Sequence, residues 1–196
     1  MNMIWQENMN LANKLTISRI VLAGIFILFL FIKGPGAKFM ALALFMAACI
    51  TDYYDGYIAR KTNSITSFGK LMDPIADKIL VLGAFLAFVQ MNVIPAWMVI
   101  IIIAREFVIT GIRMLALSQK KVLAAESGGK HKTISQMVAV IAILIFLIVR
   151  DMGLGFRHME NFETALYLLM IITVAMTLTS GISYMIRNKD IFMGEK

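Results

Sequence analysis

Charged residues and cysteine are both scarce in this sequence. Asp, Glu, Lys and Arg together make up 16% of its 196 residues, whereas 60% are hydrophobic. This composition excludes an ordinary soluble domain, in which about a quarter of the residues are charged. The single cysteine, Cys49, excludes a disulfide within the chain, and its apolar neighbours in the sequence favour a packing role. Linkers, internal repeats and low-complexity segments are also missing, so we expect one domain over residues 1–196.

Hydrophobic residues gather in six long segments. Each segment approaches the roughly 20 residues that a helix needs to cross a hydrocarbon core. The alternation of polar and apolar residues that is typical of membrane β-barrels is absent, so helices are the structure that satisfies the backbone. The sequence therefore predicts an all-α polytopic membrane protein with six transmembrane helices. The segments are Leu15–Ile32, Phe39–Asp55, Asp73–Met91, Pro95–Leu117, Ile134–Val149 and Phe162–Ile186.

The basic residues predict how the chain crosses the membrane. With six spans, both termini lie on one side, and most Lys and Arg residues fall at that side. The opposite side holds Lys33, Lys38, Arg150 and Arg157. The positive-inside rule therefore predicts a multi-pass protein of the cell membrane with both termini in the cytoplasm. We attribute the net charge of +7 to topology and to anionic lipid or substrate, and expect no nucleic acid as a partner. The segment Met1–Asn13 fits either a short interfacial helix or a frayed terminus.

Two pairs of aspartates lie beside the apolar segments, at the side predicted to face the cytoplasm. Ionisable groups at membrane depth are costly, so each is a candidate functional residue. Asp52 and Asp55 are three residues apart and share one face of a helix. Asp73 and Asp77 are four residues apart and share a face in the same way. A helix start near Asp73, which Pro74 favours, leaves a loop of about a dozen residues and lets the pairs converge.

The aspartate pairs have the chemistry of a metal site. Four like charges repel one another unless cations neutralise them, and carboxylate oxygens suit Mg²⁺ or Mn²⁺. Two divalent ions would also assist a displacement at phosphorus. Gly56 and Ala59 leave room for a flat group, and Arg60 could hold a phosphate or a carboxylate. The alternative is that the aspartates are helix caps and solvated charges, with Asp73 as an N-cap before Pro74. The complete spaced set favours the metal site.

These residues resemble the signature of the CDP-alcohol phosphotransferase family, D-x2-D-G-x2-A-R-x8-G-x3-D-x3-D, at every fixed position. The resemblance implies six transmembrane helices, a homodimer and a divalent-metal site that faces the cytoplasm. It also implies that Asp52, Asp55 and Asp73 bind metal. Asp77 would be both a metal ligand and the general base. The residues that would contact the cytidine diphosphate part of the lipid substrate are Gly56, Ala59, Arg60 and Gly69.

A second candidate site is basic. Arg105 and Arg113 lie eight residues apart in the fourth segment, which is close to two helical turns and places them on one face. Lys130, Lys132 and Thr133 lead into the fifth segment. Buried arginines together with lysines at a helix start predict an anion site that suits a phosphorylated acceptor. In the alternative interpretation, Arg105 pairs with Glu106 or another carboxylate and only holds helices together, while the lysines are topology signals.

Further stretches resemble the phosphatidylglycerophosphate synthase branch of that family. That branch transfers phosphatidyl from CDP-diacylglycerol to sn-glycerol 3-phosphate and releases CMP. The resemblance runs from about Asn13 to Asp190, and it assigns Thr16 and Arg19 to the CDP-diacylglycerol side. Ala12 replaces a proline that often precedes Asn13 in relatives. The matching stretches are Asn13–Arg19, Ala104–Glu106, Gly111–Arg113, Gly129–Thr133 and Gln136–Met137.

Other functions fit parts of the pattern. A cardiolipin synthase of the CDP-alcohol type would use phosphatidylglycerol as the acceptor, and phosphatidylserine or inositol-phosphate synthases share the chemistry. A divalent-cation transporter would also place aspartates in apolar helices. Against transport, the sequence has no matching acidic set at the other side and no inverted repeat. The aromatic residues near the aspartates fit either substrate contact or the membrane interface, and they are Tyr53, Tyr54 and Tyr57.

Overall fold

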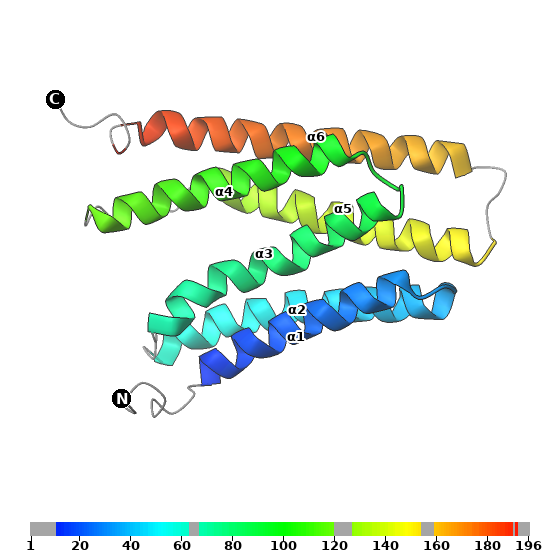
Figure 1. The fold of residues 1–196 in the computed structure, drawn as a ribbon, viewed down its shortest axis with the longest axis horizontal. Helices are drawn as coiled ribbons and strands as arrows, with labels where there is room; N and C mark the ends of the chain where they lie inside the picture. The colour runs from blue at the N-terminus through cyan, green and yellow to red at the C-terminus, as the bar shows by residue number, and fades with distance from the viewer. Residues whose placement is uncertain (1–10, 63–66, 120–126, 154–158, 190, 192–196) are drawn as a thin grey trace. The chain divides into compact units, whose positions relative to one another are not determined.

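The computed structural model describes the backbone of residues 11–62, 67–119, 127–153, 159–189 and 191. Its side chains are described over 18–51, 78–116, 118–119, 131–153, 159–189 and 191. Within the described backbone the chain forms six α-helices and no strand, which confirms the all-α class (Figure 1). The helices are α1 (Leu11–Phe31), α2 (Pro35–Thr62), α3 (Ser67–Gln90), α4 (Ala96–Ser118), α5 (Ser127–Asp151) and α6 (Met159–Arg187).

The helices are strongly apolar. Among the described residues, two helical stretches are long and apolar enough to cross a membrane, His131–Asp151 and Met159–Arg187. In α4, the apolar run is interrupted by charged residues that belong to the site described below. Large apolar side chains are also exposed on several helices, such as Leu28 at 66%, Ile100 at 63% and Phe107 at 70%. An apolar surface of this extent is typical of a protein that meets lipid.

The start of the third helix corrects the sequence analysis. α3 begins at Ser67 rather than near Asp73, so Asp73 and Pro74 lie inside the helix. Since α2 ends at Thr62, positions 63–66 separate the two helices in place of the expected loop of about a dozen residues. Proline is common in the first turn of a helix. Inside a helix it removes one backbone hydrogen bond, and the helix can continue because the flanking turns keep theirs. The segment Met1–Asn13 lies almost wholly outside the described residues, and α1 begins at Leu11.

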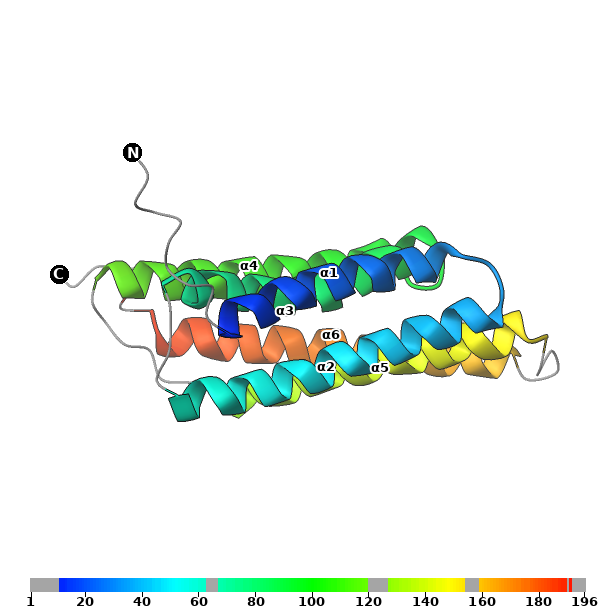
Figure 2. The ribbon, with the colours of Figure 1, turned by 90° about the horizontal axis from the view of Figure 1, so that it is seen from below.

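The chain contains two compact units, and the first comprises residues up to Ala87 together with Leu144–Leu154. In this unit α1 and α2 form an antiparallel hairpin (Figures 1 and 2). The rings of Phe26 and Phe45 meet in its core with centroids 5.6 Å apart. The buried alanines beside them allow the helices to approach closely, and they are Ala23, Ala41 and Ala48.

A buried lysine closes the turn of this hairpin. Gly34 has a φ of +103°, a conformation that glycine adopts without steric cost. Lys38 is 3% exposed, and its ammonium donates hydrogen bonds to the carbonyl oxygens of Leu30 and of Ile32, the latter at 2.8 Å. The last carbonyl groups of a helix have no partner within the helix. Lys38 therefore supplies the end of α1 with the hydrogen bonds that it lacks.

The second unit comprises Phe88–Ile143 and the residues from Gly155 onward. Here α4 and α6 pack side by side and run in the same direction, and the first part of α5 runs against them (Figures 1 and 2). A turn precedes α4, in which Asn92 has a φ of 56° and the N–H of Val93 donates to the oxygen of Phe88 at 2.9 Å. The apolar core of the unit includes Met98, Ile102, Val140, Ile143, Met170 and Val174.

Candidate functional site

The aspartate motif lies on two consecutive helices of the first unit. Asp52 and Asp55 are in the last three turns of α2, and Asp73 and Asp77 are in the first three turns of α3. The two residues of each pair therefore stand at positions that share one face of their helix. Their side chains lie outside the described residues. Where side chains are described, the structure has no group of three or more His, Cys, Asp or Glu residues that could hold a metal ion.

The remaining residues of the motif also map to these helices. Arg60 lies in α2 and Gly69 in α3. Among the residues assigned to the lipid substrate, Arg19 has a described side chain, which is buried at 3% exposure on α1. The others, for which the structure describes the backbone alone, are Thr16, Gly56, Ala59, Arg60 and Gly69. Three tyrosines of α2 are also described by their backbone alone, and they are Tyr53, Tyr54 and Tyr57.

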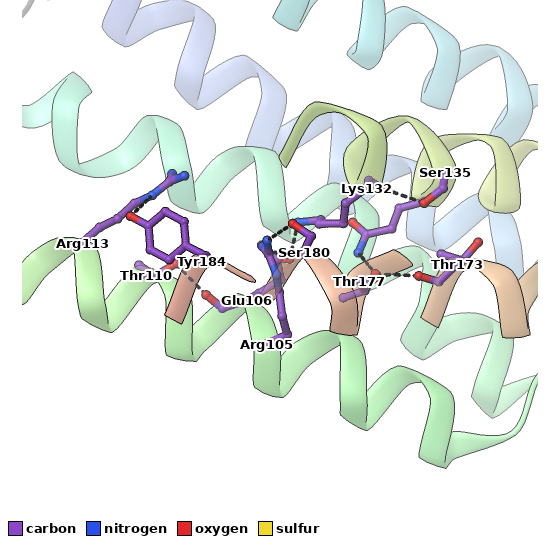
Figure 3. A network of polar contacts seen from close by, with 11 residues as sticks. Arg105, Glu106, Thr110, Arg113, Lys132, Ser135, Thr173, Thr177, Ser180 and Tyr184 are labelled. Carbon is purple, nitrogen blue, oxygen red and sulfur yellow. Dashed lines mark hydrogen bonds and ion pairs between the residues drawn. The ribbon is translucent and has the colours of Figure 1, made fainter. Parts of the chain in front are cut away.

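A buried network joins the three helices of the second unit around one carboxylate (Figure 3). Glu106 on α4 accepts a hydrogen bond on Oε1 from Arg105 Nη1 at 3.1 Å. The ammonium of Lys132, on α5, donates to the same oxygen. Arg105 Nη2 donates to the hydroxyl of Ser180 on α6 at 2.9 Å. We call these four residues the Glu106 network. The pairing of Arg105 with a carboxylate, which belonged to the alternative interpretation of the sequence, is present, and its partner is Glu106.

Arg105 reaches Ser180 because α6 has a glycine where the two helices cross. A Cβ placed on Gly181 would lie 2.9 Å from Arg105 Cγ and 3.5 Å from its Nε. No other residue type leaves this space open. Arg105 Nε is buried and has no hydrogen-bond partner in the described part of the chain. The guanidinium group is thus held between Glu106 and Ser180, with its Nε against the backbone of α6.

Arg113 is held differently, by an aromatic ring. Its Nε donates to the hydroxyl of Tyr184 at 3.4 Å, and the centre of its guanidinium group lies 5.5 Å from the ring centroid (Figure 3). Tyr184 is 2% exposed and packs in a cluster with Ile109 and Ile112. Arg113 itself is exposed, and among the described residues its two terminal nitrogens contact no acceptor. They are therefore available to an anionic ligand.

Polar residues continue along α6 beyond the Glu106 network. Gln136 on α5 donates to the hydroxyl of Thr177 at 3.4 Å, and Thr177 donates to the carbonyl oxygen of Thr173 at 2.7 Å. All three residues are buried. Thr133, a predicted site residue on α5, is exposed, and the side chain of Lys130 lies outside the described residues.

The sequence analysis missed the contributions of α6. Ser180, Gly181 and Tyr184 lie in the apolar sixth segment and carry no charge. A signal was present, because Thr173, Thr177, Ser180 and Tyr184 recur every three or four residues and so form a polar stripe on one helix face. This periodicity in the sixth segment would have predicted that the stripe faces the charged residues of the fourth segment.

The chain is similar in sequence to known proteins. The family model for CDP-alcohol phosphatidyltransferases matches residues 9–186. The CDP-diacylglycerol--glycerol-3-phosphate 3-phosphatidyltransferase of Bacillus subtilis (strain 168) is 45% identical over 148 residues, covering 69% of this chain and 77% of the relative. The enzyme of that name from Rickettsia bellii is 40% identical over 136 residues, covering 69% and 75%. That from Rickettsia typhi is 36% identical over 175 residues, covering 89% and 94%. The chain therefore belongs to the CDP-alcohol phosphatidyltransferase family.

Proposed function

We propose that this protein transfers the phosphatidyl group from CDP-diacylglycerol to sn-glycerol 3-phosphate, forming phosphatidylglycerophosphate and CMP. Family membership supports the transferase chemistry, and the names of the relatives support both substrates. The structural observation that carries the choice of acceptor is the set of cations on α4 and α5. Arg113 offers two guanidinium nitrogens that contact no acceptor among the described residues, and Lys132 offers a buried ammonium, and such cations suit a phosphate monoester.

On the CDP-diacylglycerol side, the motif aspartates would hold two divalent ions, Mg²⁺ or Mn²⁺. An all-oxygen set of four carboxylates fits these hard cations. When bound, the ions would neutralise the pyrophosphate and stabilise the charge on the leaving CMP. Gly56, Ala59 and Gly69 would leave room for the cytidine diphosphate group beside the helix backbones. Arg60, Thr16 and Arg19 would contribute polar contacts to the same substrate.

On the acceptor side, Arg113 and Lys132 would bind the phosphate of sn-glycerol 3-phosphate and thereby orient its terminal hydroxyl. Lys130 and Thr133 belong to the same proposed set, and Arg105 would support it from its position beside Glu106. Asp77 would accept the proton of that hydroxyl as the general base. The hydroxyl oxygen then forms a bond to the phosphorus that carries the diacylglycerol, and the bond from this phosphorus to CMP breaks.

The apolar helices support a position in the bilayer, where a lipid substrate is at hand. We propose six spans, with both termini and the aspartate motif on the cytoplasmic side of the cell membrane. The distribution of Lys and Arg supports this orientation. We also propose a homodimer, which the family resemblance supports.

An acceptor assay tests the function. Purified protein is supplied with labelled CDP-diacylglycerol and, separately, with sn-glycerol 3-phosphate, phosphatidylglycerol, serine or inositol phosphate. We expect phosphatidylglycerophosphate and an equal amount of CMP with sn-glycerol 3-phosphate alone. A cardiolipin product from phosphatidylglycerol would overturn the proposed acceptor. If no acceptor releases CMP, the protein is no transferase of this kind, and cation transport becomes the function to test.

A further inference from the structure

The Glu106 network forms a chain of contacts across three helices. Ser180 on α6 binds Arg105, Arg105 binds Glu106, and Glu106 binds Lys132 on α5. The side chains of Arg105, Glu106 and Lys132 are 10%, 8% and 7% exposed, so water does little to screen these contacts. Each member of the chain therefore depends on the next for its position.

The electrostatics of the network require its carboxylate. Two cations converge on one oxygen of Glu106, and buried like charges repel each other strongly when no anion lies between them. Glu106 therefore allows the two cations to lie close together.

Arg105 and Lys132 differ in how firmly their contacts hold the side chain, and therefore in how readily each can donate to a ligand. The guanidinium group of Arg105 is held by Glu106 and Ser180, and its Nε lies against Gly181. An ammonium has three N–H donors, so Lys132 can donate to Glu106 and to an acceptor oxygen at the same time. Lys132 can thus contact a phosphate while it stays bound to Glu106.

We propose that Glu106 and Arg105 are positioning residues, which fix the ammonium of Lys132 for the acceptor's phosphate without touching the acceptor themselves. Glu106 orients the ammonium through its carboxylate oxygen. Arg105, tethered to α6 by Ser180, fixes the carboxylate. This inference rests on the proposed function and assigns Glu106, Arg105 and Ser180 a role in acceptor affinity that differs from direct binding.

The first test is Glu106→Gln, which keeps the shape of the side chain and removes its charge. We expect the KM for sn-glycerol 3-phosphate to rise about tenfold, since a charged hydrogen bond that orders Lys132 is lost. The KM for CDP-diacylglycerol should stay within about twofold of the wild-type value. Glu163→Gln, which changes an exposed glutamate on α6, is the matched control and should leave both constants unchanged.

A double-mutant cycle separates positioning from an independent effect. Lys132→Met removes the ammonium and should raise the same KM. If Glu106 acts through Lys132, then Glu106→Gln adds less than about a twofold further rise in the Lys132→Met background. Effects that multiply in the double variant would overturn the proposal, because Glu106 would then act without Lys132.

Folding is monitored in the same experiment by the thermal unfolding midpoint in detergent. A lower midpoint with an unchanged KM would show that the network only holds helices together, and it would overturn the proposal.

If Glu106→Gln does not fold, Ser180→Ala decides instead, with an expected rise of about threefold in the acceptor KM. An unchanged KM in Ser180→Ala then contradicts the inference. Failure of the proposed function is recognised separately, because the wild-type protein would form no product from sn-glycerol 3-phosphate.

Discussion

At the scale of single residues, Arg113 is an exposed cation of the proposed acceptor site. Arg113→Ala should raise the KM for sn-glycerol 3-phosphate by about tenfold to a hundredfold, because a charge-assisted contact is lost. Tyr184→Phe keeps the ring and removes the hydroxyl, so we expect a rise of about two- to threefold. Steady-state kinetics with varied acceptor measure both effects.

The control for this prediction is a second pair of the same kind. Arg150 lies over the ring of Phe146, with its guanidinium centre 5.7 Å from the ring centroid. Arg150→Ala removes an arginine from an aromatic face but has no part in the Glu106 network. Its acceptor KM should equal that of the wild-type protein. An equal loss in both arginine variants would mean that the effect is one of stability.

Asp77 is the residue on which the proposed proton transfer depends. Asp77→Asn should abolish turnover, since an amide cannot accept the proton of the acceptor hydroxyl. CMP release measures turnover, and equilibrium binding of CDP-diacylglycerol shows whether the substrate still binds. We expect binding to be largely retained. Near wild-type CMP release by Asp77→Asn would refute the assignment of the base.

Residue patterns in the sequence predicted part of this site. The charges of α4 and α5 could be found because a charge within an apolar run is conspicuous, and Glu106 was recognised as a possible partner of Arg105. Its bond to Lys132 could not be predicted, because it depends on how α5 packs against α4. Tyr184 was missed because an aromatic residue in an apolar segment is typical of lipid contact.

At the scale of helices, the crossing of α4 and α6 depends on Gly181. Gly181→Ala should displace Arg105, since the new Cβ would lie 2.9 Å from Cγ, near the start of that side chain. The acceptor KM should rise about threefold or more, and the gain of up to about 1 kcal/mol in helix propensity should be lost to the clash. Kinetics and thermal unfolding in detergent are the measurements.

Gly24→Ala provides the comparison for this variant. Gly24 lies in α1 and has no atom within 4 Å of an added Cβ. This substitution should leave the KM unchanged and leave the unfolding midpoint equal or slightly higher. If Gly181→Ala behaves in the same way, Arg105 has more freedom at the crossing than the structure indicates.

Helix positions were predicted more closely than helix ends. Each of the six apolar segments lies within one helix or extends it by a few residues. The exception at α3 arose from Pro74, whose preference for a first turn was given too much weight. A proline inside a helix costs a limited free energy, and the neighbouring turns can offset that cost. The position of a proline alone therefore does not determine where a helix starts.

At the scale of the whole molecule, the proposed ions should be essential. Excess EDTA should abolish CMP release, and added Mg²⁺ or Mn²⁺ should restore it, because the carboxylates alone would repel the pyrophosphate. EDTA saturated with Mg²⁺ beforehand is the control and should have no effect. A full rate in excess chelator would remove the metal from the proposed mechanism.

The orientation in the membrane can be tested by labelling. In a Cys49→Ser background, Lys33→Cys in the α1–α2 turn should react with an impermeant maleimide in intact cells. Lys189→Cys, after α6, should react once the cells are opened. The reverse pattern would invert the proposed topology. The orientation stays a prediction, and the sequence indicates it because topology depends on where charges fall along the chain.

The order in which the helices are synthesised gives the Glu106 network a further consequence. Arg105 and Glu106 are neighbours on α4, so their charges can neutralise each other before any later helix exists, which lowers the cost of bringing α4 into a bilayer. Lys132, Ser180 and Tyr184 emerge later, on α5 and α6. A nascent chain thus carries the complete aspartate motif while the proposed acceptor site still lacks the side chains that order it, and that site would be completed when the last helix docks.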